Sequence, residues 1–143
     1  MAVAVKRVYE KPSRSDGTRV LVDRLWPRGL TRQDAALDAW LKDLAPSNEL
    51  RAWAHAHPEA WEMFRKRYLK ELGQPAANLA LQELYRLAGQ RKRLTLLYAF
   101  TNQERNNATV LKELLDGMKK PPTGTGPAAS AATRLRKAAR RPA

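Results

Sequence analysis

The sequence predicts a small α/β domain with a mostly parallel sheet of about three strands and helices around it. Three short apolar runs, at residues 2–9, 18–22 and 93–100, have the composition of buried strands. Apolar residues at helical spacing fill the long stretch between the second and third runs. Because parallel strands need a long and usually helical connection, we expect the second and third strands to run parallel.

The first half of the chain reads as two strands followed by a helix. Residues 2–9 alternate only in part, and the turn-forming residues 10–17 follow them. The second strand, residues 18–22, leads directly into a polar cluster. Thr31 and Asp34 then resemble a capping box, so we expect a helix that Pro46 ends. Its apolar stripe comprises Ala36, Leu37, Trp40, Leu41 and Leu44.

Three more helices are expected between residues 47 and 89. Ser47 is a suitable cap for the first. Pro58 suits the first position of the second, with His57 as its cap, and the break at residues 73–75 separates it from the third. The third strand and the polar segment 101–107 lead to a final helix. The apolar positions of these four helices are Leu50 and Trp53; Trp61, Phe64, Tyr68 and Leu72; Ala80, Leu84, Leu87 and Ala88; and Ala108, Leu111, Leu115 and Met118.

The chain is strongly basic, and its charge is uneven. It has 27 Lys and Arg against 14 Asp and Glu, a net charge of +13. Such an excess favours polyanionic partners, although many basic proteins have none. We expect one domain over residues 1–120 and a disordered tail rich in Pro, Gly and Ala over residues 121–143. The tail has no acidic residue, and its basic residues, candidates for contacts to nucleic acid, are Arg134, Arg136, Lys137, Arg140 and Arg141.

Several classes of function are disfavoured by what the sequence lacks. The absence of cysteine excludes disulfides, thiolate metal sites and cysteine nucleophiles. His55 and His57 lie two residues apart and would point in different directions on a helix, so we expect no metal site and no cofactor. No apolar run is long enough to span a membrane or to form a signal peptide, so we expect a cytoplasmic protein without a membrane partner. The oligomeric state is left open.

The candidate site begins where the second strand ends. Ligands of parallel α/β sheets gather at the carboxyl ends of the strands, where this chain places Asp23, Arg24 and Arg28. Either arginine suits a phosphate or carboxylate, and Asp23 could orient an arginine or act as an acid or base. The alternative is a structural network in which Asp23 pairs with an arginine and accepts backbone N–H bonds.

Further polar and aromatic side chains are expected at the same edge. Trp26 could stack on a planar ligand, or it could cover the core. Tyr98, Asn106 and Asn107 lie at and beyond the end of the third strand, so a parallel sheet would bring them opposite Asp23 and Arg28. An asparagine at a helix start can instead simply cap that helix.

Several longer motifs resemble those of one bacterial family. They are K-R-V-Y at 6–9, S-D-G-T-R-V-L-V-D-R-L-W-P-R-G at 15–29, L-D-A-W-L-K-D-L-A-P-S at 37–47, F-R-K-R-Y at 64–68, T-L-L-Y-A at 95–99 and N-N-A at 106–108. Over about residues 3–118 the chain resembles the YeaO-like proteins, a domain of unknown function in the DUF-488 group. The resemblance implies a Rossmann-like sheet and no established activity. Members often have a histidine where this chain has Arg105, and commonly one histidine where it has His55 and His57.

Two hypotheses of function follow. In the first, a positively charged pocket binds an anionic, phosphate- or nucleotide-like ligand, and whether it also catalyses a reaction is open. Asp23 is the candidate catalytic group, and the ligand-binding candidates are Arg24, Trp26, Arg28, Tyr98, Asn106 and Asn107. In the second, the protein is a non-enzymatic module that binds nucleic acid through its basic surface and its tail.

Overall fold

The computed structural model describes residues 2–90 and 93–122. The chain divides into two compact units. We call Met1–Ala45 with Leu84–Gly117 the sheet unit, and Pro46–Glu83 with Met118–Ala143 the helical unit. None of the helices in the described part is both long and apolar enough to cross a membrane.

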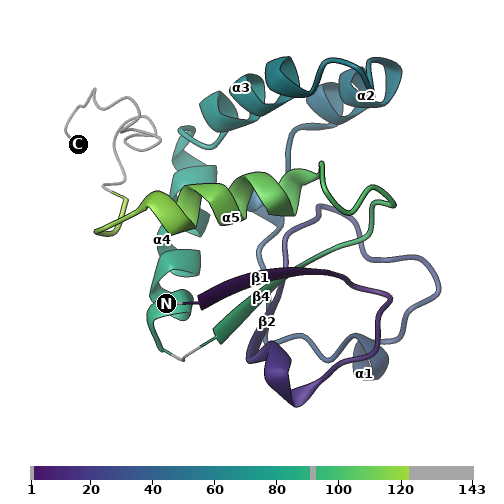
Figure 1. The fold of residues 1–143 in the computed structure, drawn as a ribbon, viewed down its shortest axis with the longest axis vertical. Helices are drawn as coiled ribbons and strands as arrows, with labels where there is room; N and C mark the ends of the chain where they lie inside the picture. The colour runs from purple at the N-terminus through teal and green to yellow at the C-terminus, as the bar shows by residue number, and fades with distance from the viewer. Residues whose placement is uncertain (1, 91–92, 123–143) are drawn as a thin grey trace. The chain divides into compact units, whose positions relative to one another are not determined.

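The sheet unit is built on four parallel strands. β1 (Ala2–Arg7), β2 (Thr18–Leu21), β3 (Ala39–Trp40) and β4 (Arg93–Tyr98) lie in the order β1-β4-β2-β3. Figure 1 shows β1, β4 and β2 side by side, with α5 (Asn107–Gly117) near them. The parallel pairing predicted between the second and third strands of the sequence is confirmed, because β2 and β4 are neighbours.

The centre of the sheet supplies the core because its strands are buried on both faces. Every residue of β2 is buried, and so are the last five residues of β4. Val8, Leu21 and Leu97 form a buried cluster against which Trp26, Leu30, Leu37, Trp40 and Ala99 pack. Continuous burial of this kind is typical of central parallel strands.

The sheet has four strands rather than about three, because residues 36–44 do not continue the predicted helix. Thr31 caps α1 (Arg32–Ala35) as expected, but the helix ends at Ala36, whose φ is +49°. Asp38 then exchanges hydrogen bonds with Arg19, its N–H donating to the Arg19 carbonyl and its carboxylate accepting from the Arg19 N–H, both at 2.8 Å. This pairing with β2 outweighs the helical spacing and leaves the short strand β3 and the 3-10 turn η2 (Lys42–Leu44).

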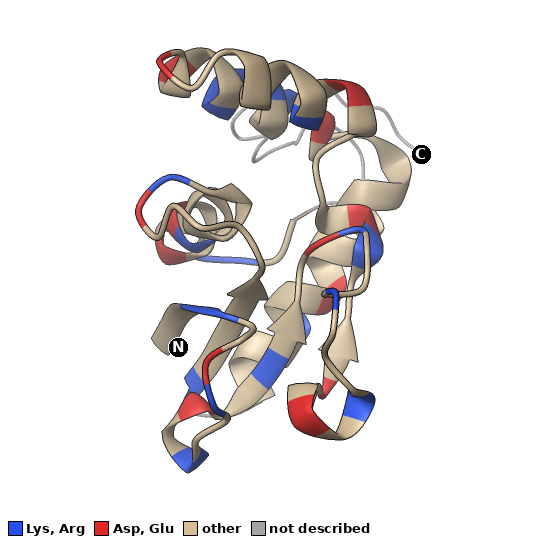
Figure 2. Cartoon of the chain, turned by 90° about the vertical axis from the view of Figure 1, so that its right-hand side faces the viewer, with Lys and Arg blue, Asp and Glu red and all other residues tan. Residues whose placement is uncertain are grey.

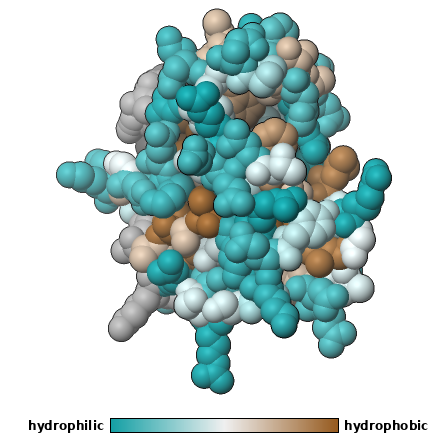
Figure 3. Space-filling view, turned by 45° about the vertical axis from the view of Figure 1, so that its right-hand side comes forward, coloured by the Kyte–Doolittle hydropathy of each residue, from teal (hydrophilic) through white to brown (hydrophobic). Residues whose placement is uncertain are grey.

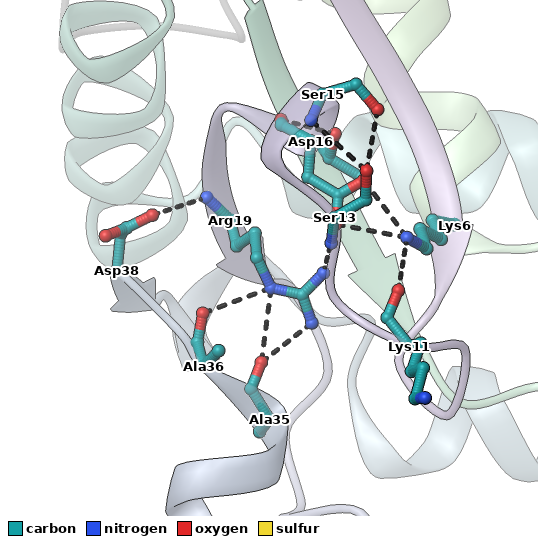
Figure 4. Close-up of polar contacts among 10 residues, drawn as sticks. Lys6, Lys11, Ser13, Ser15, Asp16, Arg19, Ala35, Ala36 and Asp38 are labelled. Atoms are coloured by element: carbon teal, nitrogen blue, oxygen red, sulfur yellow. Dashed lines mark hydrogen bonds and ion pairs between the residues drawn. The ribbon is translucent and has the colours of Figure 1, made fainter.

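A buried ionic network joins the segments at the amino end of the sheet (Figure 4). Asp16, on the 3-10 turn η1 (Arg14–Asp16), accepts from Lys6 at 3.1 Å and from Arg19 at 2.5 Å. The Arg19 guanidinium also donates to the Ala35 carbonyl at 2.7 Å, where α1 ends. Burial acts to raise the pKa of Asp16, but hydrogen bonds from Ser13, Lys6 and Arg19 outweigh it and lower that pKa.

The helical unit contains α2 (Asn48–Ala56), α3 (Trp61–Glu71) and the first part of α4 (Pro75–Gln90). Ser47 caps α2 as predicted, and its N–H and hydroxyl both donate to Glu71, at 2.8 and 2.6 Å. His57 does not begin α3: it ends α2, its N–H donating to Ala54. α3 starts three residues later than predicted, at Trp61.

The surface of both units is mixed. On the face shown in Figure 3, brown apolar side chains lie among teal hydrophilic ones. The large apolar residues that the structure leaves exposed in the described ranges are Tyr9, Leu25, Met63, Leu79 and Phe100.

Candidate functional site

The carboxyl ends of the four strands meet at one edge of the sheet unit, which we call the carboxyl edge. The segments that follow β1, β2 and β4 lie there, because all strand pairs are parallel. The predicted site residues lie in the segments after β2 and β4 or next to them, at the last residue of β4 and the first of α5. The prediction that the second and third strands of the sequence share one polar edge therefore agrees with the topology.

Asp23 and Asn107 are in direct contact, although 84 residues separate them. The Asn107 amide donates to Asp23 Oδ1 at 3.1 Å and to the Val22 carbonyl at 2.9 Å. The other carboxylate oxygen of Asp23 accepts from the Ala99 N–H at 2.9 Å. Asp23 thus ties the end of β2 to the end of β4 and the start of α5.

Asn106 caps the last helix and is buried. Its side-chain oxygen accepts from the Thr109 N–H at 3.0 Å, and its amide donates to the Asn102 carbonyl at 2.9 Å. Asn102 in turn accepts the N–H groups of Glu104 and Arg105, both at 2.9 Å. Asn106 therefore acts as a helix cap, as the alternative expects. It accepts one of the N–H groups at the N-terminus of α5.

Tyr98 ends β4 and is only 2% exposed. Burial raises the pKa of Tyr98, as does the nearby Glu10, while Arg7 and a hydrogen bond with Asn106 act to lower it. The net effect is a raised pKa, so the hydroxyl is neutral at pH 7.

Trp26 and Arg24 are engaged by the protein itself. The Trp26 indole donates to the Leu30 carbonyl at 2.6 Å, and its ring meets that of Trp40 edge-on, with centroids 5.4 Å apart. It packs on the buried cluster of Val8, Leu21 and Leu97, as the core-covering alternative expects. The Arg24 guanidinium donates to the Ala45 carbonyl at 3.3 Å.

Arg28 is the predicted ligand-binding residue that faces solvent. Its backbone carbonyl accepts from the Tyr9 hydroxyl at 2.9 Å, and the residue itself is exposed. Three neighbours at this edge were missed by the sequence reasoning: Arg7, Tyr9 and Phe100. Their positions in the sequence could have identified them, because each lies at or just beyond the end of a predicted strand.

The remaining features considered in the sequence are the two histidines and the basic tail. Within residues 2–90 and 93–122, no group of three or more His, Asp and Glu is placed to hold a metal ion. His57 instead stacks on Trp53, with ring centroids 4.7 Å apart. The five basic tail residues, Arg134, Arg136, Lys137, Arg140 and Arg141, lie outside the described residues.

Comparison with known proteins places the chain in a family. Residues 2–132 match the model of the family described as "Inactive DUF488-N3 subclade". The chain belongs to this family, which is YeaO-like. It is 46% identical to the uncharacterised protein YeaO of Escherichia coli over 117 residues, covering 80% of this chain and 97% of that protein. Uncharacterised proteins of Mycobacterium tuberculosis and Mycobacterium bovis are each 46% identical over 115 residues, or 80% of this chain and 94% of theirs. No solved structure matches.

Proposed function

We propose that the carboxyl edge of the sheet unit binds an anionic, phosphate- or nucleotide-like ligand without catalysing a reaction on it. The observation that carries this proposal is the exposure of Arg28 on a segment that the fold holds in place. Its main chain is held by the Tyr9 hydroxyl while its side chain lies in solvent. A guanidinium so placed offers a planar pair of donors to a phosphate or carboxylate.

Charge supports an anionic ligand. The sheet unit carries 15 Lys and Arg against 9 Asp and Glu, an excess of six positive charges. Both signs occur along the loops and helices, whereas the charged residues of the strands are all Lys or Arg (Figure 2). Three further arginines, Arg7, Arg24 and Arg105, lie in or next to the segments of the carboxyl edge. A positive excess raises the local concentration of anions and speeds their binding.

Binding without catalysis is favoured by the contacts of Asp23. It was the candidate acid or base, but both of its carboxylate oxygens accept hydrogen bonds from groups that the fold places there. Those donors hold the carboxylate in a fixed position, which suits a structural tie better than proton transfer. The word "inactive" in the family's description points the same way.

The proposal is tested by thermal shift on the full chain, with inorganic phosphate and thymidine monophosphate as probes. A probe at 100 times its Kd adds about 2.7 kcal/mol of stability, a shift of several degrees. We expect Arg28→Ala to lose this shift. Arg14→Ala is the matched control, because Arg14 is also exposed but lies on η1, near the start of β2. Absence of any shift, or equal losses in the two variants, would contradict the proposal.

A second candidate function is binding of nucleic acid through the basic surface and the tail. The observation in its favour is α3, which exposes Lys66, Arg67 and Lys70. Replacing the five basic residues of the tail by glutamine in the full chain separates the two candidates. If the tail neutralises about five phosphates, the log–log salt slope for duplex DNA should become shallower by about 4 to 5. Phosphate binding at the carboxyl edge should not change.

A further inference from the structure

Two aromatic rings lie exposed on neighbouring segments of the carboxyl edge. Tyr9 follows β1 and is 41% exposed, and Phe100 follows β4 and is 43% exposed. β1 and β4 are adjacent, and Arg7 pairs with Tyr98 in the sheet. Tyr9 and Phe100 are each two residues beyond that pair, so they hold equivalent positions on two adjoining segments.

One arginine holds both segments in place. The Arg7 guanidinium donates to the Phe100 carbonyl at 3.0 Å and to the Ala99 carbonyl at 2.8 Å. The same guanidinium carbon lies 5.1 Å from the centre of the Tyr9 ring, in cation–π geometry. We call Arg7, Tyr9 and Phe100 the aromatic rim.

The Tyr9 ring is fixed at its far end as well. Its hydroxyl donates to the Arg28 carbonyl at 2.9 Å, which ties the rim to the segment carrying the exposed Arg28. A ring held through its hydroxyl and by a cation over one face loses little conformational freedom when a base stacks on the other face, so less of the binding energy is offset by entropy.

We propose that the aromatic rim binds unpaired bases of single-stranded nucleic acid, with Arg28 contacting the phosphates. This deepens the proposed function and rests on it. Such sites combine exposed aromatic rings with arginines, because every base has a face that can stack and every nucleotide carries a negative charge. The excess of six positive charges on the sheet unit complements a strand with several phosphates.

Two rings on adjoining segments favour a strand over a free nucleotide, because a mononucleotide has a single base. Stacking also carries no sequence preference of its own. The rim is therefore expected to accept any unpaired stretch. A duplex should bind less well, because its bases already stack on one another.

The test is fluorescence anisotropy of the full chain with three probes: an oligothymidylate, an abasic oligonucleotide of equal length, and thymidine monophosphate in competition. Contacts from the tail to phosphates contribute equally to the two oligonucleotides, so the ratio of their affinities isolates the bases. We expect the oligothymidylate to bind more tightly than the abasic strand, and thymidine monophosphate to compete only weakly.

Phe100→Leu is the decisive variant, because it removes the ring and leaves the carbonyl that Arg7 binds. It should weaken oligothymidylate binding roughly 5- to 100-fold and leave abasic binding unchanged. Tyr9→Leu is the second variant, in case the first does not fold by circular dichroism. Met63→Ala on α3 is the control, since it removes an exposed apolar side chain from the helical unit, and it should change neither affinity.

The outcomes separate this inference from the proposed function. Equal binding of both oligonucleotides, with both weakened by Arg28→Ala, would reject the aromatic rim and keep the anion site. Thymidine monophosphate competing as well as the oligothymidylate would reject the strand in favour of a free nucleotide. If Arg28→Ala and Arg14→Ala affect every probe alike, the proposed function itself fails.

Discussion

Asp23 is the residue through which the carboxyl edge is most directly held together. Asp23→Ala removes two hydrogen bonds to a carboxylate, from the Ala99 N–H at 2.9 Å and from the Asn107 amide at 3.1 Å. Hydrogen bonds to a charged group contribute about 1.5–3 kcal/mol each. Asn107 keeps its second acceptor, the Val22 carbonyl, so we take the lower figure for both bonds. The expected loss is about 3 kcal/mol.

The assay is urea unfolding followed by circular dichroism, together with a thermal melt. For a chain of this size, about 3 kcal/mol corresponds to a fall in Tm of roughly 10 °C. Asp23→Asn should cost a similar amount, because the amide is uncharged and turns its own NH2 donor toward one of the two donors. Asp34→Asn is the matched control: its side chain is exposed on α1, and it should change the free energy of unfolding by less than about 0.5 kcal/mol.

A double-mutant cycle with Asn107→Ala then measures the contact itself. We expect a coupling energy of about 1–2 kcal/mol between residues 23 and 107. A melt of Asp23→Ala within about a degree of the unmutated protein, or additive effects in the cycle, would refute the structural assignment of Asp23. Asp23 would then return to consideration as an acid or base.

Three further predictions concern stability. Gly17→Ala should destabilise by more than about 3 kcal/mol in urea unfolding, because φ is +66° and an added Cβ would lie 2.2 Å from a backbone carbonyl of β4; Gly89→Ala on α4 has open space and should gain at most about 1 kcal/mol. The pKa of Asp16 lies below its usual 3.8 in the folded protein, since hydrogen bonds outweigh the opposing effect of burial. The stability that ionised Asp16 contributes is therefore complete above pH 3.8 and is lost as the pH falls through the lowered pKa. Asp16→Asn should remove this dependence, so the free energy of unfolding should fall less steeply at acid pH. Ser47→Ala removes the cap of α2 and a 2.6 Å hydrogen bond to Glu71, so we expect a loss of about 1–2 kcal/mol; an unchanged urea midpoint would contradict the cap.

Local pattern was sufficient to predict three of the four strands. β1, β2 and β4 are apolar runs bounded by turn-forming or polar residues, and such runs identify buried strands without any tertiary information. β3 could not be found in this way. It exists because Asp38 and Arg19 pair across the sheet, a long-range contact that overrides a helical spacing of apolar residues.

The location of the candidate site was predictable, but the tasks of its residues were not. Parallel topology alone brings the ends of β2 and β4 together, which is why Asp23 and Asn107 meet. Whether the Asp23 carboxylate is open to a ligand depends on which groups donate hydrogen bonds to it. These donors belong to Ala99 and Asn107, 76 and 84 positions away in the sequence. Tyr9 and Phe100 were assigned to strands, where an aromatic residue is expected to be buried; only the structure reveals their exposure.

We expect an anionic ligand to bind at the carboxyl edge of the sheet unit. A two-dimensional NMR titration of the isotopically labelled full chain with thymidine monophosphate would follow this edge residue by residue. We expect saturable shifts of the amide signals of Tyr9, Arg28 and Phe100, with those of α3 unchanged. Shifts confined to α3 and the tail, or no saturable shift at all, would contradict the claim.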